Sequence, residues 1–143
     1  MKYNFCFKLI LTIAFFLMKK EILSNAKITI NLNGINNNKG EIRLALFNNK
    51  LQFLKTPYKG VTSNITASNA MIVLEEIPEG EYAIAVFHDE NTNGKLDTNF
   101  LGIPKEQYGF SNHAKGQMKP PKFEDAKFKL TNEQNKFVTI NMK

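Results

Sequence analysis

Cysteine is almost absent from this chain of 143 residues, which contains only Cys6. A lone cysteine cannot form a disulfide framework or a zinc site built from several thiolates. Glycine and proline are also scarce, with eight and five residues, which excludes a collagen-like or low-complexity chain. With 43% hydrophobic and 22% charged residues, the composition predicts one globular domain.

A long apolar run is missing too. The apolar run at residues 9–18 is shorter than the roughly 20 residues that a transmembrane helix needs. It follows two lysines and precedes the small residues Ser24 and Ala26, an order typical of a secretory signal peptide. The charges at residues 19–21 leave a retained anchor as the alternative. We predict a signal peptide over residues 1–26, cleaved after Ala26, and an exported protein in the periplasm or outside the cell.

Half of the excess of positive charge belongs to this leader. The chain has 19 Lys and Arg against 13 Asp and Glu, and four of the lysines and one glutamate precede residue 27. The domain predicted over residues 27–143 therefore carries a net charge of +3. A charge of that size does not predict a nucleic-acid-binding surface. Because Cys6 also lies in the leader, thiol catalysis is excluded for the exported domain.

Apolar residues after the leader mostly alternate with polar ones, between groups of turn residues, which is typical of short antiparallel strands. Both faces of the stretch 81–88 are apolar, so we expect a central strand there. The predicted fold class is all-β, an antiparallel two-sheet sandwich of about seven strands, with residues 89–123 as a long structured loop. The expected strands are 28–32, 42–46, 61–66, 70–74, 81–88, 126–130 and 136–142.

A cluster of oxygen-bearing residues follows the predicted central strand, with alternate spacing and a glycine at the sixth position. Such a loop directs successive oxygens at a hard cation, and Ca²⁺ is the predicted ion, held with a Kd of about 10⁻⁴ to 10⁻³ M. The glutamate that ends an EF-hand loop is missing. The alternative is a series of side-chain-to-backbone turns without an ion. The predicted ligands are the side chains of Asp89, Asn91, Asn93 and Asp97 and the backbone carbonyl of Lys95.

Aromatic and ionisable residues near this loop are further candidates for a ligand site. Tyr108 and Phe110 are predicted either to cover the open end of the sandwich or to form a platform for a sugar or peptide. His88 and Glu106 are the other ligand-binding candidates. We predict a non-enzymatic binding protein. One alternative is a hydrolytic enzyme that uses His88, Asp89 and Glu106, although the nucleophile motif G-x-S-x-G is absent. The other is a structural envelope component without a ligand.

Two adjacent stretches in residues 81–112 form a distinctive motif, E-Y-A-I-A-V-F-H-D-E-N-T-N-G-K-L-D-T-N and L-G-I-P-K-E-Q-Y-G-F-S-N. In them the chain resembles the exported bacterial family DUF2141, and the resemblance extends to residues 40–47 and 120–126. It implies an envelope or secreted β-sandwich, similar to transthyretin-like, immunoglobulin-like and carboxypeptidase-regulatory-like domains. We predict an unidentified protein or glycan partner in the cell envelope. The resemblance implies no activity, so the function has to be argued from the site.

Overall fold

The computed structural model describes residues 26–143 except 117–118 and 134. The predicted signal peptide therefore lies outside the described residues, apart from Ala26, and its cleavage stays a prediction. Ala26 is fully buried, and its carbonyl oxygen accepts a hydrogen bond of 3.1 Å from the backbone N–H of Ile77. In the described part of the chain, no helix has the length and apolarity to cross a membrane.

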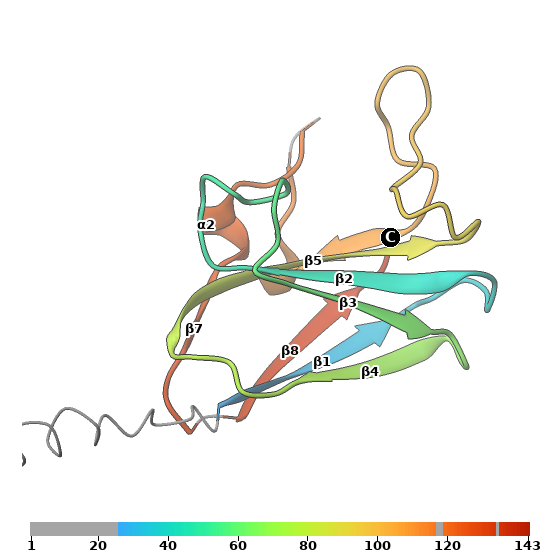
Figure 1. Cartoon of the computed structure of the whole chain (residues 1–143). Coiled ribbons are helices and arrows are strands. Elements are labelled where there is room, and N and C mark those ends of the chain that lie inside the picture. Colours follow the sequence, from blue (N-terminus) through green and yellow to red (C-terminus); the bar gives the residue numbers. More distant parts are fainter. Residues whose placement is uncertain (1–25, 117–118, 134) are drawn as a thin grey trace, which may run out of the picture.

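Two β-sheets face each other and form a sandwich (Figure 1). The smaller sheet has the strand order β4-β1-β8, and the larger has β3-β2-β5-β6, with β7 also paired to β5. The predicted all-β sandwich is confirmed, and β5 is its central strand. The elements are β1 (Lys27–Asn33), β2 (Glu41–Phe47), β3 (Lys59–Asn64), β4 (Asn69–Leu74), β5 (Gly80–Asp89), β6 (Tyr108–Phe110), the 3₁₀ helix η1 (Ser111–His113), α2 (Phe123–Ala126), β7 (Phe128–Leu130) and β8 (Asn135–Asn141).

Three details differ from the prediction. Strands β1 and β8 pair in parallel, because the last strand returns along the first, a long-range pairing that alternation does not reveal. Strand β6 lies inside the predicted loop 89–123; its three residues are too few to show a period and depend on pairing with β5. The helix α2 takes the start of the predicted strand 126–130, since Asp125 accepts a hydrogen bond from the backbone N–H of Lys122 and closes a helical turn.

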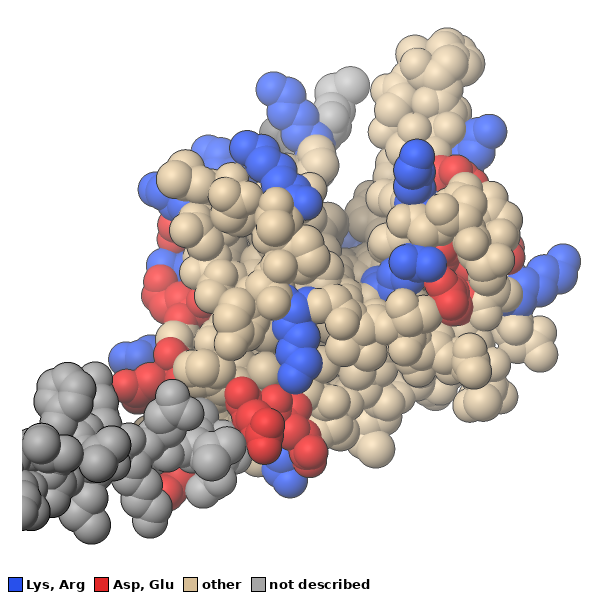
Figure 2. Space-filling model, in the orientation of Figure 1, with Lys and Arg blue, Asp and Glu red and all other residues tan. Residues whose placement is uncertain are grey.

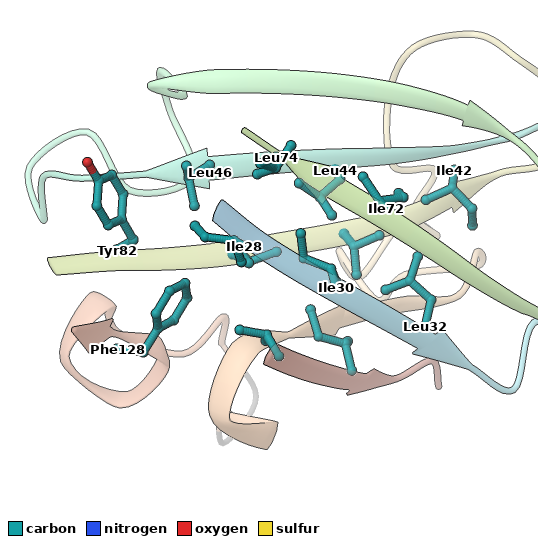
Figure 3. Packing of buried hydrophobic residues seen from close by; sticks show 14 of the residues in the cluster. Ile28, Ile30, Leu32, Ile42, Leu44, Leu46, Ile72, Leu74, Tyr82 and Phe128 are labelled. Carbon is teal, nitrogen blue, oxygen red and sulfur yellow. The ribbon is translucent and has the colours of Figure 1, made fainter. Parts of the chain in front are cut away.

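Alternating apolar side chains from both sheets fill the space between them (Figure 3). Each fully buried isoleucine or leucine contributes about 1.5–3 kcal/mol through the removal of apolar surface from water. The alternation visible in the sequence is therefore the main source of stability. The labelled core residues are Ile28, Ile30, Leu32, Ile42, Leu44, Leu46, Ile72, Leu74, Tyr82 and Phe128.

A second apolar cluster covers part of the outer face of the larger sheet. Phe53, from the segment that follows β2, packs edge-on against Phe47 and Phe123, with ring centroids 5.2 and 5.7 Å apart. Ala83 of β5 and Ala126 of α2 complete the cluster. This packing fixes the segment 48–58 and α2 on the outer face, which explains why both faces of β5 are apolar.

Candidate functional site

A row of small residues crosses the outer face of the larger sheet. The strand register places Gly60 of β3 beside Ala45 of β2, Ala45 beside Ala85 of β5, and Ala85 beside Phe110 of β6. Since side chains on one face of a sheet stand about perpendicular to it, three small residues side by side leave a depression in the surface. Phe110 closes the depression at the edge of the sheet.

The next row across the sheet is larger and more polar. It runs from Thr62 through Arg43 and Phe87 to Tyr108. The guanidinium of Arg43 donates from Nε to Asp89 Oδ2 at 2.8 Å and lies 2.6 Å, through Nη2, from a carboxylate oxygen of Glu41. Two carboxylates thus compensate the one arginine, so this row offers an aromatic surface without a strong net charge.

The two rows form the floor of a groove of about 500 Å³. Leu54 and Pro120 line it on one side, and Gly94 and Leu96 of the loop after β5 line it on the other. Figure 2 shows the hollow between the two raised parts of this face. Ligand-binding sites in proteins typically have about 300–1,000 Å³ and a mostly apolar lining with a few polar groups. The groove has both properties.

A smaller hollow of about 250 Å³ adjoins the groove and shares Tyr108 and Phe110 with it. Its lining also includes His113, Lys115 and Lys143. Desolvation, and then the nearby ammonium of Lys115, lower the pKa of the Lys143 ammonium. The two ammonium groups therefore repel each other, which disfavours the charged form of Lys143.

The first half of the loop after β5 is tied down by the carboxylate of Asp89. This side chain is fully buried, and its Oδ1 accepts a hydrogen bond of 3.0 Å from the backbone N–H of Asn93. Its Oδ2 accepts from the backbone N–H of Gly94 and from Arg43 Nε, both at 2.8 Å. Both oxygens of the first predicted ion ligand thus have protein donors.

Three other predicted ligands do converge. Asn91 Nδ2 lies 2.6 Å from Asp97 Oδ2, and Asn93 Nδ2 lies 3.0 Å from Asp97 Oδ1. Asn91 Oδ1 accepts a hydrogen bond from the backbone N–H of Asn93, and Asn93 Oδ1 accepts one from the backbone N–H of Lys95. These are the contacts of the alternative without an ion. Among the described residues, no three His, Cys, Asp or Glu side chains are grouped as metal ligands. The calcium site stays a prediction.

His88 and Glu106 serve the scaffold. Glu106 is 8% exposed and accepts hydrogen bonds from the backbone N–H groups of Glu90 and Asp97, at 3.0 and 2.9 Å, across the base of the loop. His88 is fully buried, and its Nε2 lies 2.7 Å from the carbonyl oxygen of Lys39, which can only accept. Neither residue lines the groove, whereas the predicted Tyr108 and Phe110 do.

Most of the groove is not predicted from the sequence. The residues without a prediction include Arg43, the small residues Ala45 and Ala85, and the wall residues Leu54 and Leu96. One signal for the groove is present in the sequence of β5. Both faces of this strand are apolar, and the outer face has alanine, a small residue, at the two successive outward positions 83 and 85. Small residues on the outer face of a central strand indicate that another part of the protein or a ligand approaches the sheet closely.

Comparison with known proteins places the chain in a family. No curated protein and no solved structure was found to match it. Residues 30–138 match the family described as "Uncharacterized protein conserved in bacteria (DUF2141)". The matched range runs from β1 to β8, so it includes both sheets, the loop after β5 and the groove. The chain therefore belongs to the DUF2141 family, as its motif predicts.

Proposed function

We propose that this protein is an exported, non-enzymatic binding protein of the periplasm or the cell exterior, and that its ligand occupies the groove on the outer face of the larger sheet. The observation that carries the proposal is the groove itself, with a floor of small residues and a lining of aromatic side chains. A ligand with an apolar face, such as a sugar ring or an extended peptide, fits this chemistry because aromatic side chains pack against such faces.

The absence of exposed reactive groups among the three candidate catalytic residues supports a binding role. His88 and Asp89 are fully buried and Glu106 is 8% exposed. Each accepts or donates hydrogen bonds that hold backbone or Arg43 in place. A hydrolytic mechanism requires an acid or base within hydrogen-bond reach of the substrate, and these three residues face the scaffold instead.

Filling the groove tests the proposal. We expect Ala85→Leu to reduce binding of the fluorescent probe anilinonaphthalenesulfonate at least about tenfold, since the added isopropyl group occupies the floor and displaces the probe. Ala67→Leu, the same change at an exposed position outside the groove, should bind the probe like the wild type. A panel of oligosaccharides and peptides, tested as competitors, then identifies the ligand class. Unchanged probe binding by Ala85→Leu would contradict the proposal.

A weak Ca²⁺ site in the loop is a second proposal, favoured by the convergence of Asn91 and Asn93 on the carboxylate of Asp97. Rotation of the two amides would turn oxygen instead of nitrogen toward a cation near Asp97, whereas Asp89 is held by Arg43. One available carboxylate gives a weak site, and Ca²⁺ sites with few charged ligands have Kd values of about 10⁻³ M. Bound Ca²⁺ would stiffen one wall of the groove.

Melting curves test the ion. At 5 mM CaCl₂ and a Kd of about 10⁻³ M, binding should stabilise the fold by about 1 kcal/mol and raise the Tm by about 3–5 °C relative to EGTA. Asp97→Asn should abolish this difference between the two buffers. Asp125→Asn, which alters the cap of α2, should keep it. If the wild type has the same Tm in EGTA and in CaCl₂, the proposed Ca²⁺ site is wrong.

A further inference from the structure

Residues 97–105 form a narrow projection, which we call the apolar finger. Its two sides are joined by hydrogen bonds of 2.8 Å from Asn99 N–H to the carbonyl oxygen of Ile103 and from Lys105 N–H to that of Asp97. The side-chain oxygen of Asn99 accepts from the backbone N–H groups of Leu101 and Ile103, at 2.9 and 3.0 Å. The finger is thus internally braced, and its tip has a defined shape.

The tip of the finger is apolar and projects into solvent (Figure 1). Phe100 is 95% exposed, Leu101 68% and Ile103 55%. Contact of these side chains with water is unfavourable, and the bracing of the finger prevents them from folding back onto the sandwich. A group of exposed large apolar side chains on a soluble domain indicates an interaction surface.

A second apolar projection lies across the groove. In the segment 48–58, Leu51 is 70% exposed and Leu54 is 40% exposed. Phe53, between them in the sequence, is buried against Phe47 and Phe123 and anchors the segment to the outer face. Figure 1 shows that this segment and the finger rise from the same face of the larger sheet. The two apolar projections therefore point the same way.

Positive charge accompanies both projections. Three segments rise from this face, at residues 48–58, at 98–105 and, in the described part of the chain, at 112–116 and 119–122. None of these residues is an aspartate or glutamate; the carboxylate of the finger is that of Asp97, at its base. Figure 2 shows blue Lys and Arg side chains around the raised parts, and red carboxylates beside them at the base of the finger and lower down. A face with this charge attracts an anionic partner. The lysines of the three segments are Lys50, Lys55, Lys105, Lys115, Lys119 and Lys122.

We propose that this raised face docks onto an anionic lipid surface, with the tip of the finger and Leu51 inserted among the lipids and the lysines at the headgroups. Separate apolar projections surrounded by lysines fit a fluid surface, which adapts to each of them; a rigid protein partner would need a matching pocket for each. Lysine side chains place their apolar stems among lipids while the ammonium stays at the headgroups. Apolar insertion and attraction to anionic lipids are additive in peripheral membrane binding.

Sedimentation with vesicles tests this surface. The full-length gene product, with its natural N-terminal processing, is mixed with vesicles that contain 30% phosphatidylglycerol, a fraction of about one third chosen to give a clear surface charge. We expect the wild type to bind these vesicles and to bind pure phosphatidylcholine at least about tenfold more weakly. Phe100→Ser/Leu101→Ser should reduce binding at least about tenfold. Lys50→Ser/Lys55→Ser should reduce it about fivefold or more at low salt.

The control variant is Met71→Ser/Phe137→Ser, which removes two apolar side chains that are about as exposed as Leu101, at 68% and 63%, from the outer face of the smaller sheet. It should bind like the wild type, and all variants share one N-terminus. No binding of the wild type to anionic vesicles, equal binding by the finger variant, or a dimer that the finger variant dissociates in the absence of vesicle binding would each overturn the proposal. Phe100 and Leu101 do not line the groove, so this result is independent of the probe-binding test.

Discussion

Asp89→Ala is expected to lower the free energy of unfolding by about 3–5 kcal/mol, the range for removal of one partner from a buried ion pair. The carboxylate of Asp89 is fully buried and accepts hydrogen bonds from Arg43 and from the backbone N–H groups of Asn93 and Gly94. Without it, two backbone donors lose their acceptor, at about 1–3 kcal/mol for each that stays buried. The guanidinium of Arg43 would keep only Glu41 as partner.

The lower end of this range is the better expectation, because the Arg43 side chain is 35% exposed and water can reach part of the guanidinium. Urea unfolding gives the free energy directly. Asp97→Ala is the matched control; its carboxylate accepts only from two exposed asparagine amides, so its removal should cost about 1 kcal/mol. A loss of less than about 1 kcal/mol for Asp89→Ala would show that the buried pair does not hold the loop.

Most strands could be predicted from the sequence because each of them buries one of its two faces in the core. In β1 and β2 isoleucine and leucine occupy every second position, and this alternation follows directly from the packing of the two sheets. β6 and α2 could not be predicted in this way. β6 has three residues and is defined by its partner β5, and α2 is a single turn closed by Asp125. Such elements depend on tertiary contacts more than on local pattern.

In the candidate site, too, only the residues with a local sequence signal could be predicted. Tyr108 and Phe110 could be identified because they are large aromatic residues close in the sequence to the predicted ion loop, and both line the groove. The floor could not be identified, because Gly60, Ala45 and Ala85 become neighbours only through the register of three strands. Spacing in a loop predicts which side chains are close together, as for the asparagines around Asp97. Spacing within strands does not predict what another strand places beside them.

Gly40→Ala is expected to lower the free energy of unfolding by more than about 4 kcal/mol or to prevent folding. Losses of this size are exceptional and result from backbone clashes or disrupted buried networks. Gly40 has a φ of +65°, and a Cβ atom there would lie 1.9 Å from the carbonyl oxygen of Asp89 and 2.7 Å from the Cα of Glu90. Both neighbours are backbone atoms, so no side-chain rotation relieves the clash. The turn would have to move away from the end of β5.

That movement would also break a buried hydrogen bond. The carbonyl oxygen of Lys39, directly before Gly40, is the acceptor for His88 Nε2, and His88 Nδ1 has no partner among the described residues. A displaced turn would also remove the partner of Nε2 and leave both ring nitrogens of a fully buried imidazole without a hydrogen bond. The loss of the Nε2 hydrogen bond would lower the free energy of unfolding by about 1–3 kcal/mol more. The contact of this turn with β5 therefore stabilises the same end of the strand from which the loop of the groove begins.

Gly102→Ala is the matched control, because Gly102 also has a positive φ, +78°, and no heavy atom lies within 4 Å of the added Cβ. It should cost about 1 kcal/mol, the conformational strain alone. Urea unfolding of both variants separates strain from clash. If both variants lose the same free energy of unfolding, the turn before β2 can move away from β5 without a large cost in stability, which would contradict the prediction. A large loss confined to Gly40→Ala would mean that the turn and the end of β5 form one rigid base for the loop.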